Sequence, residues 1–204
     1  MDFSEFFSPS VYLKGYDTHL PVWHILSHLN TILSQYPLGT IASVIPEEVD
    51  LQNSSEIYIE KGVVVEKFTT IKGPCVICKG STIRQSAYVR EGSFIGPGSM
   101  IGHSTEVKGS FLFEGVQAAH FAYIGDSIVG KNALLGAGVV FANVRLDKKE
   151  IHLEGKPTGR KKLGAILGDF SQIGCNSVIN PGSFLKKHSK FPPLSCIKSS
   201  YASY

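Results

Sequence analysis

The sequence predicts an all-β fold, a parallel β-helix that an α-helix precedes and a basic loop interrupts. Three observations support this prediction. Aliphatic residues return at every sixth position from residue 59 onward, apolar residues follow helical spacing near the N-terminus, and Lys and Arg gather at residues 144–164. We therefore expect a helical and extended segment at residues 1–50, followed by the β-helix at residues 51–200.

Composition excludes several classes of protein. Of 204 residues, 43% are hydrophobic and 18% charged, as in ordinary globular proteins that bury a full core. We expect no secretory signal, because no basic region precedes an apolar run, and no membrane span, because about 18 uninterrupted apolar residues occur nowhere. A net charge of +3 does not indicate nucleic-acid binding. These features favour a cytoplasmic protein.

The stretch "LPVWHILSHLNTILSQYPLG" at residues 20–39 predicts the helix. Pro21 suits a first turn, apolar residues fall at 22, 26, 29 and 33, and "YPLG" ends the pattern. We expect Trp23 to anchor this helix to the first coil of the β-helix. His24 and His28 have the four-residue spacing of metal ligands, but no third ligand accompanies them, which favours solvated or partner-facing side chains.

The six-residue repeat is the dominant signal. Its aliphatic positions are Ile59, Val65, Ile71, Ile77, Ile83, Val89, Ile95, Ile101 and Val107, then Leu167, Ile173, Ile179 and Leu185. A small residue stands two places before most of them, at Thr69, Cys75, Ser81, Ala87, Ser93, Ser99, Thr105, Ala165, Ser171, Ser177 and Ser183. Side chains of a strand alternate between two faces, so every sixth residue points to the same side.

Short strands joined by regular bends would therefore stack into a parallel β-helix with these aliphatics inside, each coil roughly 4.8 Å from the next. Glycines at 62, 80, 92 and 98 fit the bends, where a positive φ or a missing side chain is needed. In "CVIC", Cys75 occupies a small-residue position, whereas Cys78 follows Ile77 and should point outward. No second CxxC accompanies the pair, so we interpret its members as reduced thiols and expect no metal there.

The interruption "VRLDKKEIHLEGKPTGRKKLG" at residues 144–164 carries seven Lys or Arg against three acids, a local charge of +4. Two interpretations stay open. The segment is either a solvated basic loop or a lid that contacts anionic ligands, since Lys and Arg favour phosphates.

The segment "SAYVREGSFIGPGSMIGHSTEVKGSFLFEGVQAAHFAYIGDSIVGKNALLGAGVVFANV" resembles the acetyltransferase domain of the bacterial bifunctional N-acetylglucosamine-1-phosphate uridyltransferase/glucosamine-1-phosphate acetyltransferase. That domain belongs to the hexapeptide-repeat acyltransferase superfamily. The run "ANVRLDKKEIHLEGKPTGRKKLGAILGD" is similar to the archaeal sugar-phosphate nucleotidyltransferase type, and the "VWHILSHLNTIL" helix resembles the segment before its β-helix. The resemblance implies a left-handed β-helix with three hexads per coil.

The resemblance also implies a site. It places the catalytic base at His120 and the sugar-phosphate contacts at Arg90, Lys108, Tyr123, Asn143 and Lys149. It places acetyl-CoA along Ala137 and Gly138 and near Cys175, which stands where relatives have a serine. No metal is implied. A second sugar-binding asparagine of the family is Leu134 here.

The implied activity is acetyl-CoA-dependent N-acetylation of an amino-sugar 1-phosphate, glucosamine 1-phosphate above all. This reaction supplies the synthesis of UDP-N-acetylglucosamine and cell-wall precursors. The implied assembly is a homotrimer whose sites lie between subunits. No glycine-rich start of a uridyltransferase domain is present, so we do not expect that activity.

The residues around His120 suit this chemistry. An amine attacks a thioester only as the free base, and a neutral imidazole can take its proton near neutral pH. Small residues at 118, 119 and 122 would leave room for a sugar, and a backbone N–H near Gly136–Gly138 or Asn143 could stabilise the oxyanion. Arg90 and Lys108 are one 18-residue coil apart, which stacks two cations and calls for an anion between them.

Two alternatives remain. His103 and His120 lie almost one coil apart, as in zinc enzymes of the γ-carbonic anhydrase type, although no third histidine follows at close spacing. The chain could also be a binding or scaffold subunit that keeps the β-helix without turnover. Leu134 and the short C-terminal run "FPPLSCIKSSYASY", which leaves little chain to hold coenzyme A, favour that alternative.

Overall fold

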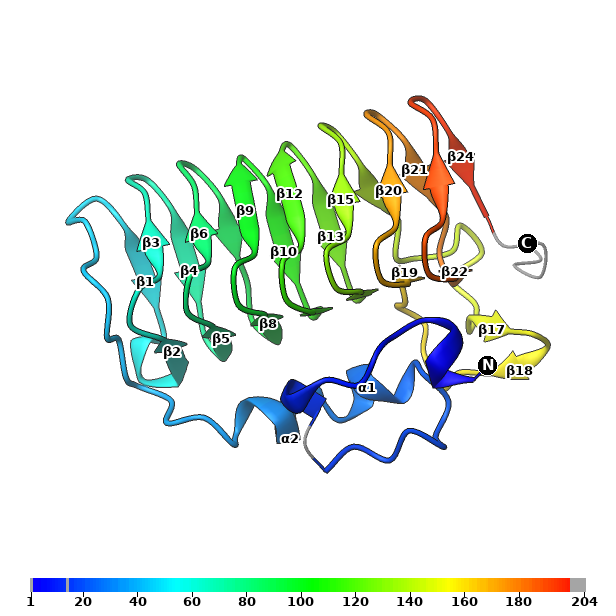
Figure 1. Cartoon of the computed structure of the whole chain (residues 1–204), viewed down its shortest axis with the longest axis horizontal. Coiled ribbons are helices and arrows are strands. Elements are labelled where there is room, and N and C mark those ends of the chain that lie inside the picture. The colour runs from blue at the N-terminus through cyan, green and yellow to red at the C-terminus, as the bar shows by residue number, and fades with distance from the viewer. Residues whose placement is uncertain (1, 14, 199–204) are drawn as a thin grey trace.

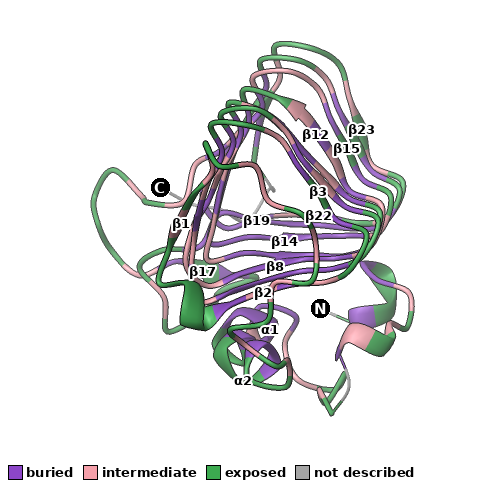
Figure 2. Cartoon of the chain, turned by 90° about the vertical axis from the view of Figure 1, so that its left-hand side faces the viewer, coloured by how far each residue is buried: buried purple, intermediate pink, exposed green. Residues whose placement is uncertain are grey.

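The computed structural model describes residues 2–13 and 15–198. The chain winds into a left-handed parallel β-helix of triangular section (Figures 1 and 2). Seen from its N-terminal end in Figure 2, β1 (Asp50–Gln52), β2 (Ile57–Ile59) and β3 (Val64–Val65) occupy the three sides in turn, and the chain turns counterclockwise as it recedes. The predicted fold class is confirmed.

Three parallel sheets form the sides of this prism. Sheet 1 contains β1, β4 (Thr70–Lys72), β7 (Tyr88–Val89), β10 (Glu106–Lys108), β13 (Tyr123–Gly125), β16 (Val140–Phe141), β21 (Val178–Ile179) and β24 (Cys196–Ile197). Sheet 2 contains β2, β5 (Cys75–Ile77), β8 (Ser93–Ile95), β11 (Phe111–Leu112), β14 (Ile128–Val129), β19 (Ala165–Leu167) and β22 (Ser183–Leu185). Sheet 3 contains β3, β6 (Thr82–Ile83), β9 (Met100–His103), β12 (Gln117–His120), β15 (Leu134–Leu135), β20 (Gln172–Ile173) and β23 (Lys190–Phe191).

The predicted aliphatic positions fill the interior of the prism. All of them, from Ile59 to Leu185, are buried in one continuous core. Most of the small residues two places earlier are Ser or Thr, whose buried hydroxyls join successive coils. Ser81 Oγ donates to the Gly96 carbonyl at 3.0 Å, and Ser99 Oγ donates to the Phe113 carbonyl at 3.1 Å. These positions are small and polar because a buried corner has room for one hydroxyl, which must be hydrogen-bonded.

The coils are not all of one length. Val107 lies 18 positions after its partner Val89, but the next partners, Ile124 and Phe141, each follow after only 17. The missing residue falls both times at the edge between sheets 1 and 2, where the interior ladder steps by five, from Val107 to Leu112 and from Ile124 to Val129. Strict counting by six therefore stops at Val107, although the β-helix continues.

The N-terminal segment differs from the prediction in two respects. Its helix is divided into α1 (His24–Ser27) and α2 (Leu29–Leu33), because His28 leaves helical geometry at φ −93° and ψ 1°. Short 3₁₀ turns, η1 (Phe3–Glu5) and η2 (Val11–Leu13), precede it, and η3 (Ser54–Glu56) follows β1. The segment also runs along the outer side of sheet 2, rather than capping the first coil (Figure 1).

The N-terminal segment lies against sheet 2 because this sheet is apolar on both faces. Its outward residues Val76, Phe94, Phe111 and Ile128 are buried, and they form an outer cluster with Trp23 and the apolar residues of both helices. Trp23 is buried in this cluster and so helps to anchor the segment to the outer side of sheet 2. Covering this face removes from water a patch that would otherwise favour aggregation.

The basic loop leaves the prism after β16 and carries an antiparallel hairpin, β17 (His152–Leu153) and β18 (Lys156–Pro157). Ile151, Leu153 and Leu163 are buried in the outer cluster. The hairpin lies close to Gly182, where an added Cβ would stand 2.5 Å from Cγ2 of Ile151. The loop is therefore partly packed on its own chain, while Lys148, Lys149 and Lys156 are exposed.

No helix in residues 2–13 and 15–198 is long and apolar enough to cross a membrane. The final residues of the C-terminal run, 199–204, lie outside the described part of the chain, and with them the expectation about a short C-terminus.

The two cysteines of "CVIC" face opposite ways, as predicted. Cys75 belongs to the interior core and Cys78 to the outer cluster. Cys78 is nevertheless buried, because the N-terminal segment covers it. Burial raises the pKa of the Cys75 and Cys78 thiols to about 12. Cys175 and Cys196 are exposed.

We predict that only Cys175 and Cys196 react with a thiol reagent in the native protein at pH 8. A thiol with a pKa near 12 is about one part in 10⁴ thiolate at that pH, and the thiolate is the nucleophile. Titration with a chromogenic disulfide checks this, before and after unfolding in guanidinium. The Cys175→Ser/Cys196→Ser variant is the control and should react only when unfolded. Rapid native labelling of that variant would contradict the packing of the N-terminal segment on sheet 2.

Candidate functional site

The predicted site residues divide between two edges of the prism, with the outward face of sheet 1 between them. The edge where sheet 3 passes into sheet 1 is called the histidine edge and carries residues 120, 137, 138 and 175. The edge where sheet 1 passes into sheet 2 is called the charged edge and carries residues 90, 108, 126 and 143. Tyr88, Glu106 and Tyr123 are neighbours across sheet 1, on the face opposite the interior core.

His120 ends β12 and is exposed. It pairs in register with His103 of the preceding coil. The prediction about its small neighbours is largely wrong. Ala118 and Ala122 are buried in the interior core, so they make no room beside the imidazole, and only Ala119 is partly exposed. The ring is accessible because it sits at an edge of the prism.

The residues predicted to line the acetyl donor lie on this histidine edge. The Gly138 N–H donates to the His120 carbonyl at 3.0 Å, and the Asn176 N–H donates to the Ala137 carbonyl at 2.8 Å. Residues 120, 137–138 and 175–176 thus occupy three successive coils. Cys175 is exposed next to Gly136, where an added Cβ would stand 3.0 Å from its Sγ. The structure brings His120, Ala137, Gly138 and Cys175 together.

Arg90 and Lys108 lie on the charged edge, in adjoining coils, because each follows one member of the Val89–Val107 pair. The predicted stacking of two cations is confirmed. The prediction that an external anion must separate them is wrong, since three carboxylates of the chain already compensate them.

Two of these carboxylates, those of Glu106 and Glu91, pair with Arg90. Its NH1 group donates to Glu106 Oε1 at 2.9 Å, and its NH2 group donates to Glu91 Oε1 at 3.3 Å. The hydrogen bond to Glu106 raises the pKa of Arg90. The Nε atom of Arg90 is buried without a hydrogen-bond partner.

The third carboxylate, that of Asp126, pairs with Lys108. Lys108 Nζ lies 3.1 Å from Asp126 Oδ2, and the two side chains are only 16% and 11% exposed. Sequence reasoning assigned no role to Glu91, Glu106 or Asp126. Glu106 and Asp126 do stand inside the quoted "STEVK" and "IGDS", so the signal was a charged residue next to each predicted ligand.

Asn143 links Asp126 of the charged edge to Tyr123 on the outward face of sheet 1. Its Nδ2 donates to Asp126 Oδ2 at 2.5 Å and to the Tyr123 hydroxyl at 3.3 Å. Gly125 makes this contact possible, because a Cβ there would stand 2.5 Å from the Tyr123 hydroxyl and 2.8 Å from Asn143 Nδ2. Lys108, Tyr123 and Asn143 are therefore brought together through Asp126.

Lys149 and Leu134 lie apart from this group. Lys149 is exposed in the basic loop, where its N–H donates to Asp147 Oδ1 at 3.1 Å, and that loop leaves the prism at the charged edge, away from His120. Arg145 binds both oxygens of Asp147 and lowers the pKa of that carboxyl. Leu134 lies on sheet 3 beside Gln117 and Gln172, not on sheet 1.

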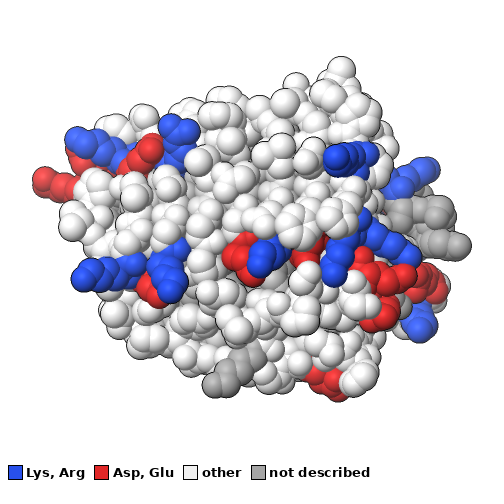
Figure 3. All heavy atoms as spheres, viewed as in Figure 1, with Lys and Arg blue, Asp and Glu red and all other residues white. Residues whose placement is uncertain are grey.

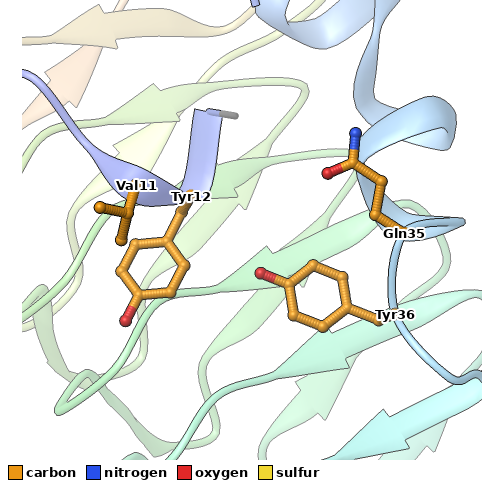
Figure 4. A pocket seen from close by; sticks show the side chains of 4 residues that line it. All are labelled: Val11, Tyr12, Gln35 and Tyr36. Carbon is orange, nitrogen blue, oxygen red and sulfur yellow. The ribbon is translucent and has the colours of Figure 1, made fainter. Parts of the chain in front are cut away.

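A pocket in the N-terminal segment is lined by none of these residues. It measures about 430 Å³ and is lined by Val11, Tyr12, Gln35 and Tyr36 of the N-terminal segment. In Figure 4 the Tyr36 hydroxyl points toward Tyr12, and both rings pack against Phe94 of sheet 2. No group of three or more His, Cys, Asp or Glu among the described residues could hold a metal ion.

Comparisons with known proteins show which family the chain resembles. The chain is 36% identical over 177 residues to the protein named Bifunctional protein GlmU of Methanococcus maripaludis, a match that covers 84% of this chain and 42% of that relative. It is 38% identical over 94 residues to a bifunctional sugar-1-phosphate nucleotidylyltransferase/acetyltransferase of Sulfurisphaera tokodaii, covering 44% of this chain and 23% of that relative. The chain thus spans less than half the length of these relatives.

A solved structure of a putative acetyltransferase from Bacillus cereus matches with a TM-score of 0.43 and 17% identity, over 71% of this chain and 74% of that one. A family model described as "GMPPB C-terminal domain" matches residues 71–180. That interval holds more than half of the chain and contains Arg90, Lys108, His120 and Asn143. The chain therefore belongs to the GMPPB C-terminal domain family, and its relatives include the archaeal GlmU proteins.

Proposed function

We propose that this chain is an acetyl-CoA-dependent N-acetyltransferase that acts on an amino-sugar 1-phosphate, glucosamine 1-phosphate above all. In this proposal its product feeds the synthesis of UDP-N-acetylglucosamine and cell-wall precursors. One observation carries the proposal. An exposed histidine and a polar, cation-bearing edge lie at opposite ends of the same strands, with Tyr123 on the face between them. An amino-sugar phosphate bound over that face would find cations for its phosphate and a base for its amine.

The chemistry follows from the two edges. His120 takes the proton of the sugar amine as the nitrogen attacks the thioester carbonyl, and the tetrahedral intermediate then releases coenzyme A as its thiol. The oxyanion needs a free donor. The N–H groups of Gly136 and Gly138 already donate to Ile173 and His120 carbonyls, and Asn143 is engaged by Asp126 and Tyr123. The Ala137 N–H, which lies between those two glycines, is the donor we assign to the oxyanion.

We predict that His120→Ala keeps its fold and loses about 10²–10⁴ in kcat, the usual contribution of a general base. The side chain is exposed and contributes nothing to the interior core, so thermal unfolding should be unchanged. Acetyl-CoA consumption with glucosamine 1-phosphate measures the loss, and His103→Ala on the preceding coil is the matched control. Normal turnover by His120→Ala would assign the histidine a structural role only.

We predict that Arg90→Ala and Lys108→Ala mainly raise KM for the sugar phosphate. Each should cost roughly 1.5–3 kcal/mol, the contribution of a hydrogen bond to a charged group. Glucosamine without its phosphate serves as the control substrate. It should react poorly with the wild type and hardly worse with the variants, whereas equal losses on both substrates would contradict phosphate binding at this edge.

We further propose a homotrimer with its sites between subunits. The N-terminal segment covers sheet 2, which leaves the outward faces of sheets 1 and 3 for packing against other copies (Figure 2). Sheet 3 faces the viewer in Figure 3, and the middle of its outward face is largely free of Lys, Arg, Asp and Glu. Its outward residues include Val64, Thr82, Met100, Gln117, Leu134 and Gln172. Packing on these two faces would enclose the histidine edge.

The proposed role of Lys149 depends on that assembly. Its loop leaves the charged edge, so Lys149 would complete a site whose His120 belongs to another chain. His120→Ala and Lys149→Ala should each be nearly inactive alone, and co-refolded mixed trimers should recover roughly a quarter of the wild-type activity if subunits assemble at random. Sedimentation checks the trimer, and activity of the mixture checks the sharing. No recovery from trimers proven to be mixed would place both residues on one chain.

Two observations favour a second class of function, a binding subunit. The cations of the charged edge already have carboxylate partners, and Leu134 replaces a sugar-binding asparagine of the related acetyltransferases. A binding subunit without turnover would bind sugar phosphate yet consume no acetyl-CoA, and the wild-type assay separates it from the enzyme.

A further inference from the structure

Asp126 lies where the charged edge meets the base of the basic loop. Its Oδ2 atom accepts hydrogen bonds from both Lys108 Nζ, at 3.1 Å, and Asn143 Nδ2, at 2.5 Å. Its main-chain carbonyl accepts from the Gly164 N–H at 2.9 Å, and the Asn143 carbonyl accepts from the Leu163 N–H at 2.9 Å. One residue therefore contacts a cation of the site and both ends of the loop.

The shortened coils put the carboxylate in this position. Asp126 adopts a left-handed conformation with φ 48°, and its N–H donates to the Lys108 carbonyl at 2.9 Å. Gly109 lies beneath it on the preceding coil, where a Cβ would stand 2.8 Å from Asp126 Oδ1. Aspartate tolerates the left-handed region better than most residues. The loss of one residue from each coil thus brings the carboxylate over Lys108.

The contacts of Asp126 differ from those of a structural aspartate in the same prism. The buried side chain of Asp169, near the edge between sheets 2 and 3, accepts only main-chain N–H groups, from Ser8 at 2.7 Å and from Lys131 at 2.8 Å. The side chain of Asp126 binds only side chains, and both belong to the predicted sugar-phosphate site. Through Asn143 it also reaches the Tyr123 hydroxyl.

We propose that Asp126 is a positioning residue that aligns Lys108 and Asn143 for the sugar phosphate and sets the anion affinity of the charged edge. This inference rests on the proposed acetyl transfer. The carboxylate performs two separable tasks. Its oxygen holds two donors side by side, and its negative charge competes with the phosphate group for Lys108.

Two variants separate these tasks. Asp126→Asn removes the charge but retains an oxygen acceptor of the same shape, whereas Asp126→Ala removes both. Glu114→Gln is the matched control, because Glu114 forms a similar 3.0 Å pair with Lys131 at the edge between sheets 2 and 3. Binding is measured by calorimetry with glucose 1-phosphate, which has the phosphate but no amine to acetylate. Turnover is measured with glucosamine 1-phosphate and acetyl-CoA.

Asp126→Asn should bind glucose 1-phosphate about two- to fivefold more tightly than the wild type, because the carboxylate no longer competes with the phosphate for Lys108. Its kcat should fall by less than that of Asp126→Ala, because the acceptor oxygen is retained. Asp126→Ala should lose about 10²-fold in kcat, as misplaced contacts to a substrate do. Glu114→Gln should match the wild type in both measurements.

Unchanged or weaker binding by Asp126→Asn would overturn the role of the charge, and a wild-type kcat for Asp126→Ala would overturn the role in alignment. Asp126→Asn is isosteric, so the binding measurement decides the question even if Asp126→Ala fails to fold. A wild type that binds glucose 1-phosphate but consumes no acetyl-CoA would refute the proposed function alone, and the calorimetric comparison would still decide how Asp126 acts.

Discussion

The hydrogen bonds between successive coils are the constraint on which every other feature of this chain depends. Each strand of the three sheets is only two to four residues long and could not persist alone, but it pairs in parallel with the strands of adjoining coils. That pairing repeats with the length of one coil, so a side chain at a given corner always meets the same corner of the next coil. Residues far apart in sequence thereby form straight columns.

The edge between sheets 1 and 2 departs from this regularity, and the candidate site follows from the departure. The coils through Lys108 and Asp126 each omit one residue there, and the basic loop is inserted at the same edge one coil later. A tighter turn brings Asp126 over Lys108, and the insertion brings Asn143 to the same carboxylate. Lys108 and the base of the basic loop are thus coupled by local geometry, whereas His120 sits on a regular edge.

The N-terminal segment determines which surfaces remain available. Sheet 2 is apolar on its outer face, and the helices cover it with Trp23, Leu26 and their neighbours. Sheets 1 and 3 remain uncovered, and the histidine edge lies between them. The same cover buries Cys78, so a thiol that the sequence placed on the outward side of its strand is nevertheless packed.

The sequence by itself determined the β-helix, the interior ladder and the opposite orientation of Cys75 and Cys78, because strand alternation makes a six-residue period equivalent to one face. The motif around His120 also indicated residues that the structure groups, Ala137, Gly138 and Cys175 on one edge, Lys108 and Asn143 on the other, and Tyr123 on the face between them. Only the tertiary structure decided that Ala118 and Ala122 point inward, that the helix breaks at His28, and that carboxylates compensate Arg90 and Lys108. These outcomes depend on which coils are shortened and on what covers sheet 2. Both arise from packing between residues distant in the chain, which a local period does not report.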